Sequence, residues 1–332
     1  MTSSQNSCGS WRTEDERNPA ATAIASSDMV FADMYLQPDA ADPVLDEQII
    51  VEAARRHVPD SGRLLAVDES GGEARAYFLE GDLIVKTQRP HRLRPRTSLA
   101  KEAFFLHELH RRGDFPVPRV LGHGEVGGTE YLCLTRIPGA ALSRTNLDPG
   151  DRHRALVRLG STLRAIHDID QAVLAQSDLL PGDRDPIDLR ARVAGAFGRL
   201  AAAFDSDARL AAVVDIRRIA AERIEATPDD AAPVSLHSNP GPEHTFVDPC
   251  SGAFTGLIDF GDAYRSHPAF DFRPWVGGDA AAVLEGYWTG EHPPADFEKV
   301  RHTVLLIDAL GRAARGRLTA EGLAATLDQL TR

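Results

Sequence analysis

Apolar residues change their spacing along the chain, and these changes predict the order of its elements. Residues 46–57 carry isoleucine and alanine at helical spacing, which predicts a first helix. Three short apolar or alternating runs follow at residues 63–68, 75–80 and 82–87, with glycine-containing turns between them. Such runs are typical of strands joined by tight turns. This part of the sequence therefore predicts an antiparallel meander.

The pattern then becomes mainly helical. Apolar positions at residues 99–111 predict a helix that nearby prolines end, and strand candidates follow at residues 120–125 and 130–137. Further helical patterns cover residues 152–168, 188–204 and 209–226. The order predicts an α+β protein in which a small antiparallel sheet with one helix precedes a larger, mainly helical part.

The first residues show no sustained period. Residues 1–44 mix serine, asparagine, alanine, aspartate and proline, which predicts a disordered or loosely attached arm. A Pro-Gly pair at residues 138 and 139 closes the strand-rich part. We therefore expect two lobes, at residues 45–138 and 139–332.

Composition fits a globular protein of the cytoplasm. The chain has 332 residues, 42% hydrophobic and 26% charged, which is enough for two packed units that share a cleft. Cys8, Cys133 and Cys250 are odd in number and scattered, which favours a reducing compartment over a disulfide framework. No run approaches the roughly 18 apolar residues of a membrane span, and residues 1–30 lack a signal-peptide pattern. We expect a cytoplasmic protein with no membrane partner.

The net charge of −12 bears on the kind of partner. Binding to phosphates requires a basic surface, so nucleic acid is not expected as the main partner. A small cationic substrate would suit an acidic protein, although solubility alone also accounts for such a charge.

The densest chemical signal lies between residues 235 and 272. Asp259 ends the apolar run Leu257-Ile258 and precedes Phe260-Gly261, as in the D-F-G element whose aspartate binds magnesium in kinases. The alternative is that Asp259 is an ordinary turn residue before glycine. Kinase-like phosphotransferases place a histidine, an aspartate and an asparagine at fixed spacing upstream. Those positions here hold His237, Asn239 and His244.

A second set of residues lies in the strand-rich part. Lys86 ends the apolar run 83–85, and Glu102 lies on the helix that follows. In kinases a strand lysine reaches the ATP phosphates and pairs with a glutamate on the next helix; alone, Lys86 would be an ordinary strand lysine. A turn containing Ser70, Gly71 and Gly72, here called the glycine turn, offers backbone N–H groups to an anion.

Taken in order, these motifs resemble the aminoglycoside phosphotransferase family of the protein-kinase-like fold. The resemblance extends from about residue 45 to at least residue 290. It rests on Lys86, Glu102, the hinge-like segment 131–139, the LGSTLRAIH helix at residues 159–167, and residues 237–271. It implies a two-lobed fold, with ATP and Mg²⁺ as cofactors and a small molecule as substrate.

The resemblance also implies roles for single residues. Lys86 and the glycine turn would hold the ATP phosphates, and Glu102 would aim Lys86. Asp259 and His244 would carry the metal. His237 would support the catalytic loop, and Asp271 would anchor it, in the family's D-P-x-x-D signature, whose first aspartate is His267 here.

Two positions depart from the family pattern. The catalytic aspartate is replaced by Asn239, whose neutral amide orients a hydroxyl but does not accept its proton. The asparagine metal ligand is replaced by His244, although some members of the family share that histidine; imidazole is a poorer magnesium ligand than oxygen. Glu243 beside it is either a further carboxylate for the site or a solvated loop residue.

The sequence thus predicts an ATP-dependent phosphotransferase acting on a hydroxyl of a small molecule, an aminoglycoside-like antibiotic or a secondary-metabolite intermediate. Asn239 would orient the acceptor hydroxyl. The alternatives are a catalytically degenerate, pseudokinase-like binding protein, or the same fold used for different chemistry. Trp275 and Trp288 are interpreted as packing residues rather than substrate platforms.

Overall fold

The computed structural model describes residues 35–94, 98–180, 189–229 and 232–331. Most of the predicted arm, residues 1–34, lies outside the described residues, as does the last residue. Near the end of this arm, the Asp42 carboxylate forms ion pairs with Arg75 at 2.9 Å and Arg89 at 2.7 Å. These contacts join residue 42 to the strands of the first lobe.

The first lobe contains the predicted antiparallel sheet, in the strand order β1-β2-β3-β5-β4. Its strands are β1 (Leu64–Asp68), β2 (Ala74–Leu79), β3 (Leu83–Gln88), β4 (Val120–Val126) and β5 (Thr129–Thr135). Helix α2 (Glu47–Arg55) packs on one face, against Tyr77, Val85 and Cys133. Because side chains alternate along a strand, Lys86 lies on the other face. The predicted meander is confirmed.

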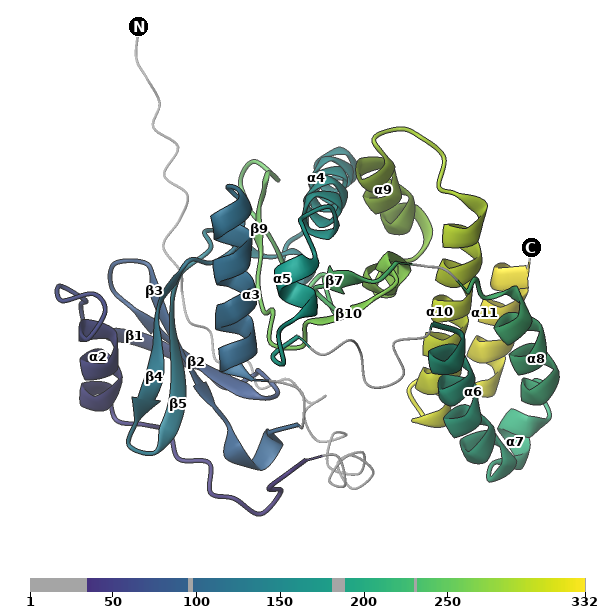
Figure 1. The fold of residues 1–332 in the computed structure, drawn as a ribbon, viewed down its shortest axis with the longest axis horizontal. Coiled ribbons are helices and arrows are strands. Elements are labelled where there is room, and N and C mark those ends of the chain that lie inside the picture. Colours follow the sequence, from purple (N-terminus) through teal and green to yellow (C-terminus); the bar gives the residue numbers. More distant parts are fainter. Residues whose placement is uncertain (1–34, 95–97, 181–188, 230–231, 332) are drawn as a thin grey trace, which may run out of the picture.

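Helix α3 (Leu99–Arg112) covers that other face, as the sequence predicted (Figure 1). The Ser98 hydroxyl accepts the backbone N–H of Lys101, which caps the helix at its first turn. Leu106 and Leu109 of α3 share a buried core with Leu132 and Leu134 of β5. Glu102, in the first turn, is thereby fixed next to the face that carries Lys86.

The second lobe is mainly helical but holds short strands where the two lobes meet. Helices α4 (Pro149–His167), α5 (Ala172–Ala175) and α9 (Gly277–Trp288) lie beside the strand pairs. The strands are β6 (Ala140–Ala141), β7 (Val234–Leu236), β8 (Thr245–Val247), β9 (Phe254–Leu257) and β10 (Tyr264–Ser266). Two short 3₁₀ segments are described in this lobe, Leu142–Arg144 and Pro268–Phe272, and another, Pro90–Arg92, follows β3 in the first lobe. The chain crosses between the lobes at Gly139, whose φ of +94° suits glycine.

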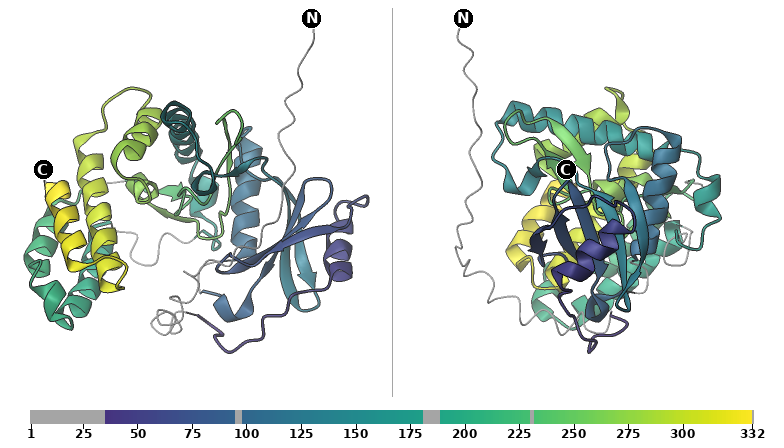
Figure 2. Two further views of the ribbon diagram at one scale, coloured as in Figure 1. Left: turned by 180° about the vertical axis from the view of Figure 1, so that it is seen from behind. Right: turned by 90° about the vertical axis from the view of Figure 1, so that its left-hand side faces the viewer.

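A group of helices occupies the end of the molecule opposite the sheet, as Figures 1 and 2 show. It consists of α6 (Leu189–Asp205), α7 (Ala208–Ala211), α8 (Ile216–Ala226), α10 (Ala295–Ala314) and α11 (Ala320–Thr331). Trp275 is 1% exposed and Trp288 packs against the same core, so their interpretation as packing residues is confirmed.

The prediction of one helix over residues 209–226 is wrong. The chain forms α7 and α8 instead, with residues 212–215 between them. The Asp215 carboxylate accepts the N–H of Arg218 and begins a new helix, while Asp207 caps α7 in the same way. An aspartate that binds the backbone two or three residues ahead favours a cap over a helix interior.

Helices α4 and α9 approach each other closely because glycines lie at the contact. A Cβ atom on Gly160 would lie 2.0 Å from the carbonyl oxygen of Val283, and one on Gly286 would lie 1.9 Å from that of Val157. The Ser161 hydroxyl donates to the Gly286 carbonyl at 3.1 Å. The contact therefore leaves no room for a larger residue.

We expect Gly160→Ala to lower the free energy of unfolding by about 2 kcal/mol, because the added methyl forces the two backbones apart. Gly198→Ala on α6 is the matched control, since a Cβ there meets nothing within 4 Å. The control should be neutral or stabilising, by up to about 1 kcal/mol from helix propensity. Urea unfolding followed by circular dichroism measures both changes; equal effects would contradict the tight crossing.

Candidate active site

Lys86 is the centre of a charge cluster built from both lobes. Its Nζ lies 2.6 Å from Glu102 Oε2 and 2.7 Å from Asp259 Oδ1. Lys86 comes from β3, Glu102 from α3, and Asp259 from the loop after β9. The predicted contact between Lys86 and Glu102 is present, and Asp259 joins them from 173 residues away.

Burial and charge act against each other in this cluster. Burial alone would lower the pKa of Lys86, but the Asp259 and Glu102 carboxylates outweigh it and raise that pKa. Burial raises the pKa of Glu102, whose side chain is 1% exposed, against the opposing effect of Lys86. For Asp259 burial also acts upward, but Lys86 and His244 lower its pKa overall. Its side chain keeps 45% of its surface exposed, so a ligand can reach the carboxylate.

Two loops at the site, one after β7 and one after β9, each contain a residue with a strained backbone. Asp259 has a φ of +72° and Ser238 a φ of +83°, a region that side-chain-bearing residues avoid. Such conformations cost about 1–3 kcal/mol and persist where the surroundings over-determine them. Strain of this kind clusters at functional sites.

Asp271 holds the loop after β7, which contains Ser238. Its carboxylate, 0% exposed, accepts the backbone N–H groups of His237 at 2.9 Å and Ser238 at 2.7 Å. His167 Nε2 lies 3.1 Å from the same carboxylate, and His167 Nδ1 contacts the Tyr287 hydroxyl at 2.9 Å. Asp271 is therefore a buried anchor that joins the loop to α4 and α9.

His237 is occupied by backbone contacts. Its Nε2 donates to the Ile258 carbonyl at 2.8 Å, and its Nδ1 lies 3.2 Å from the Asn239 N–H. Burial lowers the pKa of His237 to about 4. A neutral imidazole with both nitrogens engaged supports the loop and orients residue 259.

His244 lies between Asn239 and Asp259. Its Nδ1 is 2.8 Å from the Asn239 carbonyl, which only accepts, so Nδ1 carries the proton. Its Nε2 lies 3.3 Å from Asp259 Oδ2. Metal-binding histidines commonly donate their second ring nitrogen to a carbonyl in this way. The contact between His244 Nε2 and Asp259 Oδ2 has an alternative interpretation, which is an ion pair between an imidazolium and a carboxylate.

The pair formed by Asp259 and His244 fits a magnesium site of the kinase type. Among the described residues, no three His, Cys, Asp or Glu side chains are grouped so as to hold a metal unaided. Magnesium in such sites takes one or two protein ligands and completes its shell with phosphate oxygens and water. One accessible carboxylate with a second donor beside it matches that requirement.

The glycine turn connects β1 to β2 and is held in place by Arg89. Arg89 donates to the carbonyl oxygens of Glu69 and Gly71, both at 3.1 Å, while its guanidinium also binds Asp42. These two hydrogen bonds to Arg89 fix the backbone of the turn, which leads into the start of β2.

Sequence reasoning missed Arg94, which bridges the two lobes. Its Nη2 contacts both oxygens of Asp262, at 2.9 and 2.8 Å, and its Nε lies 2.6 Å from Glu73 Oε1. Glu73 follows the glycine turn, and Asp262 lies three residues after Asp259. The only sequence signal was the basic stretch at residues 89–96, which has no helical or strand period.

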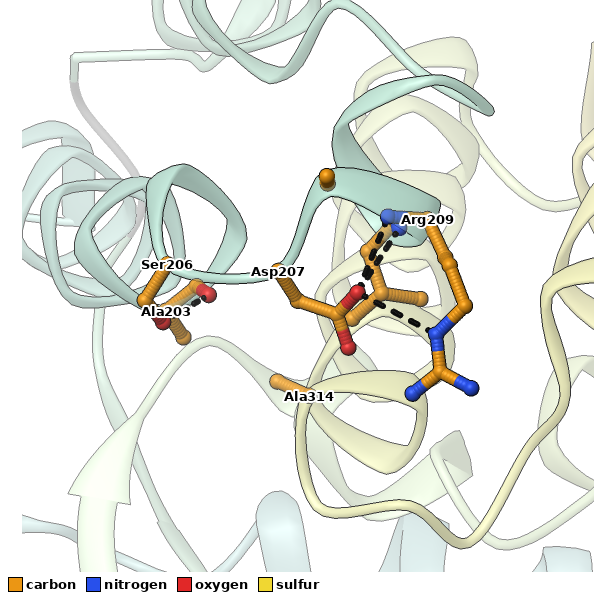
Figure 3. A pocket seen from close by; sticks show the side chains of 7 residues that line it. Ala203, Ser206, Asp207, Arg209 and Ala314 are labelled. Carbon is orange, nitrogen blue, oxygen red and sulfur yellow. Dashed lines mark hydrogen bonds and ion pairs between the residues drawn. The ribbon is translucent and has the colours of Figure 1, made fainter.

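A surface cavity of about 570 Å³ lies far from this cluster, among α6, α7 and α10 (Figure 3). One of its lining residues is Asp207, which accepts the backbone N–H groups of Arg209 and Leu210 to cap α7. The Arg209 Nε is 3.6 Å from the same carboxylate. These groups serve the helix start, so the cavity adds nothing to the chemistry at Lys86.

The two-lobed fold, with an ion-paired lysine and an accessible aspartate where the lobes meet, is that of the protein-kinase-like class. A sequence model of the phosphotransferase enzyme family (APH) matches residues 65–303, so the chain belongs to that family. The predicted fold and family are confirmed.

Solved structures of phosphotransferases share the fold. The GDP complex of wild-type aminoglycoside 2'-phosphotransferase-IIIa is 17% identical, with a TM-score of 0.58 over 86% of this chain and 98% of that one. Macrolide 2'-phosphotransferase MphH from Brachybacterium faecium is 20% identical, with a TM-score of 0.56 over 84% and 97%. The streptomycin–ATP complex of APH(2")-IIa is 14% identical, with a TM-score of 0.54 over 87% and 97%. A search of curated protein sequences finds no match. At these identities the likeness concerns the fold.

No helix in the described part of the chain combines the length and apolar character needed to cross a membrane. Within the same residues, Cys133 is buried and Cys250 is exposed.

We expect Asp271→Asn to lower the free energy of unfolding by about 3 kcal/mol, because it weakens charge-assisted hydrogen bonds from three donors to a fully buried carboxylate. Asp296→Asn is the control, since that carboxylate forms an exposed ion pair with Lys299 on the first turn of α10. Chemical denaturation of both variants tests the anchor. Equal stability of Asp271→Asn and wild type would refute it.

Proposed function

We propose that the protein is an ATP-dependent phosphotransferase that acts on a hydroxyl group of a small molecule. The observation that carries the proposal is Lys86 held between Glu102 and Asp259 at 2.6 and 2.7 Å, in a chain of the phosphotransferase enzyme family. Catalysis of phosphoryl transfer depends mostly on positioning and on stabilising charge. A fixed cation beside an accessible carboxylate supplies both.

In this proposal each residue of the cleft has one task. Lys86 and the N–H groups of the glycine turn bind the ATP phosphates, and Glu102 fixes the direction of the ammonium group. Asp259 and His244 hold Mg²⁺, which when bound neutralises negative charge on the phosphates. His237 keeps the loop in shape, and the Asn239 amide orients the acceptor hydroxyl. The site then lies between a nucleotide-binding lobe at residues 45–138 and a substrate-binding lobe at residues 139–332.

For the acceptor we propose a cationic, hydroxyl-rich molecule of the aminoglycoside kind. Similar structures hold kanamycin, gentamicin or streptomycin, and one is a macrolide phosphotransferase. The net charge of −12 favours the cationic class. Soluble, cytoplasmic action fits the few, scattered cysteines and the need for ATP.

The second candidate is a protein that binds nucleotide and ligand without transferring phosphate. Asn239 favours it, because the amide takes no proton from the acceptor. The two candidates differ in product formation and agree on nucleotide binding. Incubation with ATP, Mg²⁺ and kanamycin, gentamicin, streptomycin or a macrolide separates them: phosphotransfer releases ADP and adds the mass of a phosphoryl group to the acceptor.

Nucleotide binding is the first quantity to measure. Mg²⁺ and ATP at 100 times Kd should stabilise the wild-type fold by about 2.7 kcal/mol, which raises the Tm by about 5 °C. Asp259→Ala should abolish the Tm shift, because the metal loses its accessible carboxylate. Asp60→Ala, which changes an exposed turn residue outside the cleft, should keep the shift. Wild-type protein without any shift at saturating ATP or GTP would refute the proposed function.

A further inference from the structure

The loop that carries Asn239 brings a second oxygen to the same place. Gly241 has no side chain, and a Cβ atom built there would lie 3.2 Å from Glu243 Oε2 and 3.6 Å from Asn239 Oδ1. The carboxylate and the amide therefore converge on one side of Gly241, no farther apart than the sum of these two distances.

The backbone beneath Glu243 is well fixed. Pro240 and Pro242 restrict the chain on both sides of Gly241. The Pro242 carbonyl accepts the Ser143 N–H at 3.0 Å, and the Gly241 carbonyl accepts two backbone N–H groups, also at 3.0 Å. The position of Glu243 next to Asn239 is thus a property of the loop, while only the side chain rotates.

Among the described residues, no cation contacts the Glu243 carboxylate. Glu102 and Asp259 share Lys86, and Asp262 binds Arg94. Glu243 is exposed and forms no ion pair or hydrogen bond with any residue that the structure describes. It is an acid beside Asn239 whose oxygens remain accessible to a ligand.

We propose that Glu243 is the general base that Asn239 cannot be, an inference that rests on the proposed phosphotransferase function. The acceptor oxygen forms a bond to the γ-phosphorus as the bond from that phosphorus to the β,γ-bridging oxygen breaks and its electron pair leaves on ADP. The hydroxyl proton passes to a Glu243 carboxylate oxygen and from there to water. Asn239 orients the hydroxyl, so two residues share the task of one aspartate.

A two-residue cycle tests this assignment. Wild type, Glu243→Gln, Asn239→Asp and the double variant are assayed with Mg²⁺ and ATP, using kanamycin, gentamicin, streptomycin and water as acceptors. Glu243→Gln should lower kcat about 100-fold, with the nucleotide Kd unchanged, because general-base catalysis contributes about 10²–10⁴-fold. Adding Asn239→Asp should restore kcat to within about tenfold of wild type. Glu225→Gln, an exposed acid on α8, should match wild type.

The other outcomes overturn the inference in distinct ways. Full activity of Glu243→Gln, or a loss that Asn239→Asp does not rescue, means that Glu243 takes no proton. A rise in the Mg²⁺ concentration needed for half-maximal rate, with kcat unchanged at saturating Mg²⁺, would make Glu243 a metal ligand instead. Wild-type protein that binds nucleotide but transfers phosphate to no acceptor, water included, refutes the base together with the transferase. Wild-type protein that transfers phosphate while Glu243→Gln does so equally well leaves the transferase and refutes the base alone.

Discussion

One lysine joined to two carboxylates from different lobes is the interaction on which the cleft depends. Glu102 is almost wholly buried, and an isolated carboxylate there would be costly to desolvate. Lys86 offsets that cost and at the same time binds Asp259, so the sheet, α3 and the loop after β9 meet at one ammonium group. Breaking a buried ion pair by removing one partner typically costs about 3–5 kcal/mol, which applies to Lys86 and Glu102. The Asp259 side chain is 45% exposed, so water or a ligand replaces it at Lys86 more readily. Any anion that binds at Lys86 competes with Asp259 before it competes with Glu102.

The loops that contain Ser238 and Asp259, across from the sheet, are held by a different set of contacts. Ser238 and Asp259 both hold positive φ angles, and neither is glycine. Asp271 fixes the first through two backbone hydrogen bonds, and His237 fixes the second by donating to the carbonyl of Ile258. Strain survives only where such contacts over-determine the backbone. The anchor itself is buried among α4 and α9, whose glycine-mediated crossing leaves little freedom to move. Rigid packing far from solvent thus sets the direction of side chains that face the ligand.

The sequence predicted what short-range patterns encode. Strands β1, β2 and β3 are short apolar or alternating runs separated by glycine-containing turns, so they could be predicted from local pattern. Lys86 and Glu102 lie only 16 residues apart on neighbouring elements. The contact between Lys86 and Asp259 spans 173 residues and was not predicted, because the resemblance assigned Lys86 to the phosphates and Asp259 to the metal. The bridge from Arg94 to Asp262 spans 168 residues and belongs to no motif, so it was missed. Strands β7, β8 and β10 have three residues each, too few for a period to appear. The break between α7 and α8 was missed because the capping role of Asp215 was overlooked within a helical pattern.

The departures from the family pattern in the loop at residues 237–244 are linked in space. His244 Nδ1 contacts the carbonyl of Asn239, and Glu243 Oε2 and Asn239 Oδ1 both lie on the side-chain side of Gly241. In the proposed mechanism these two neighbouring side chains divide the work of one carboxylate. The neutral Asn239 amide would orient the acceptor without adding negative charge beside the phosphates, which like charges would repel. The proton would go to Glu243, a separate acid on the same loop.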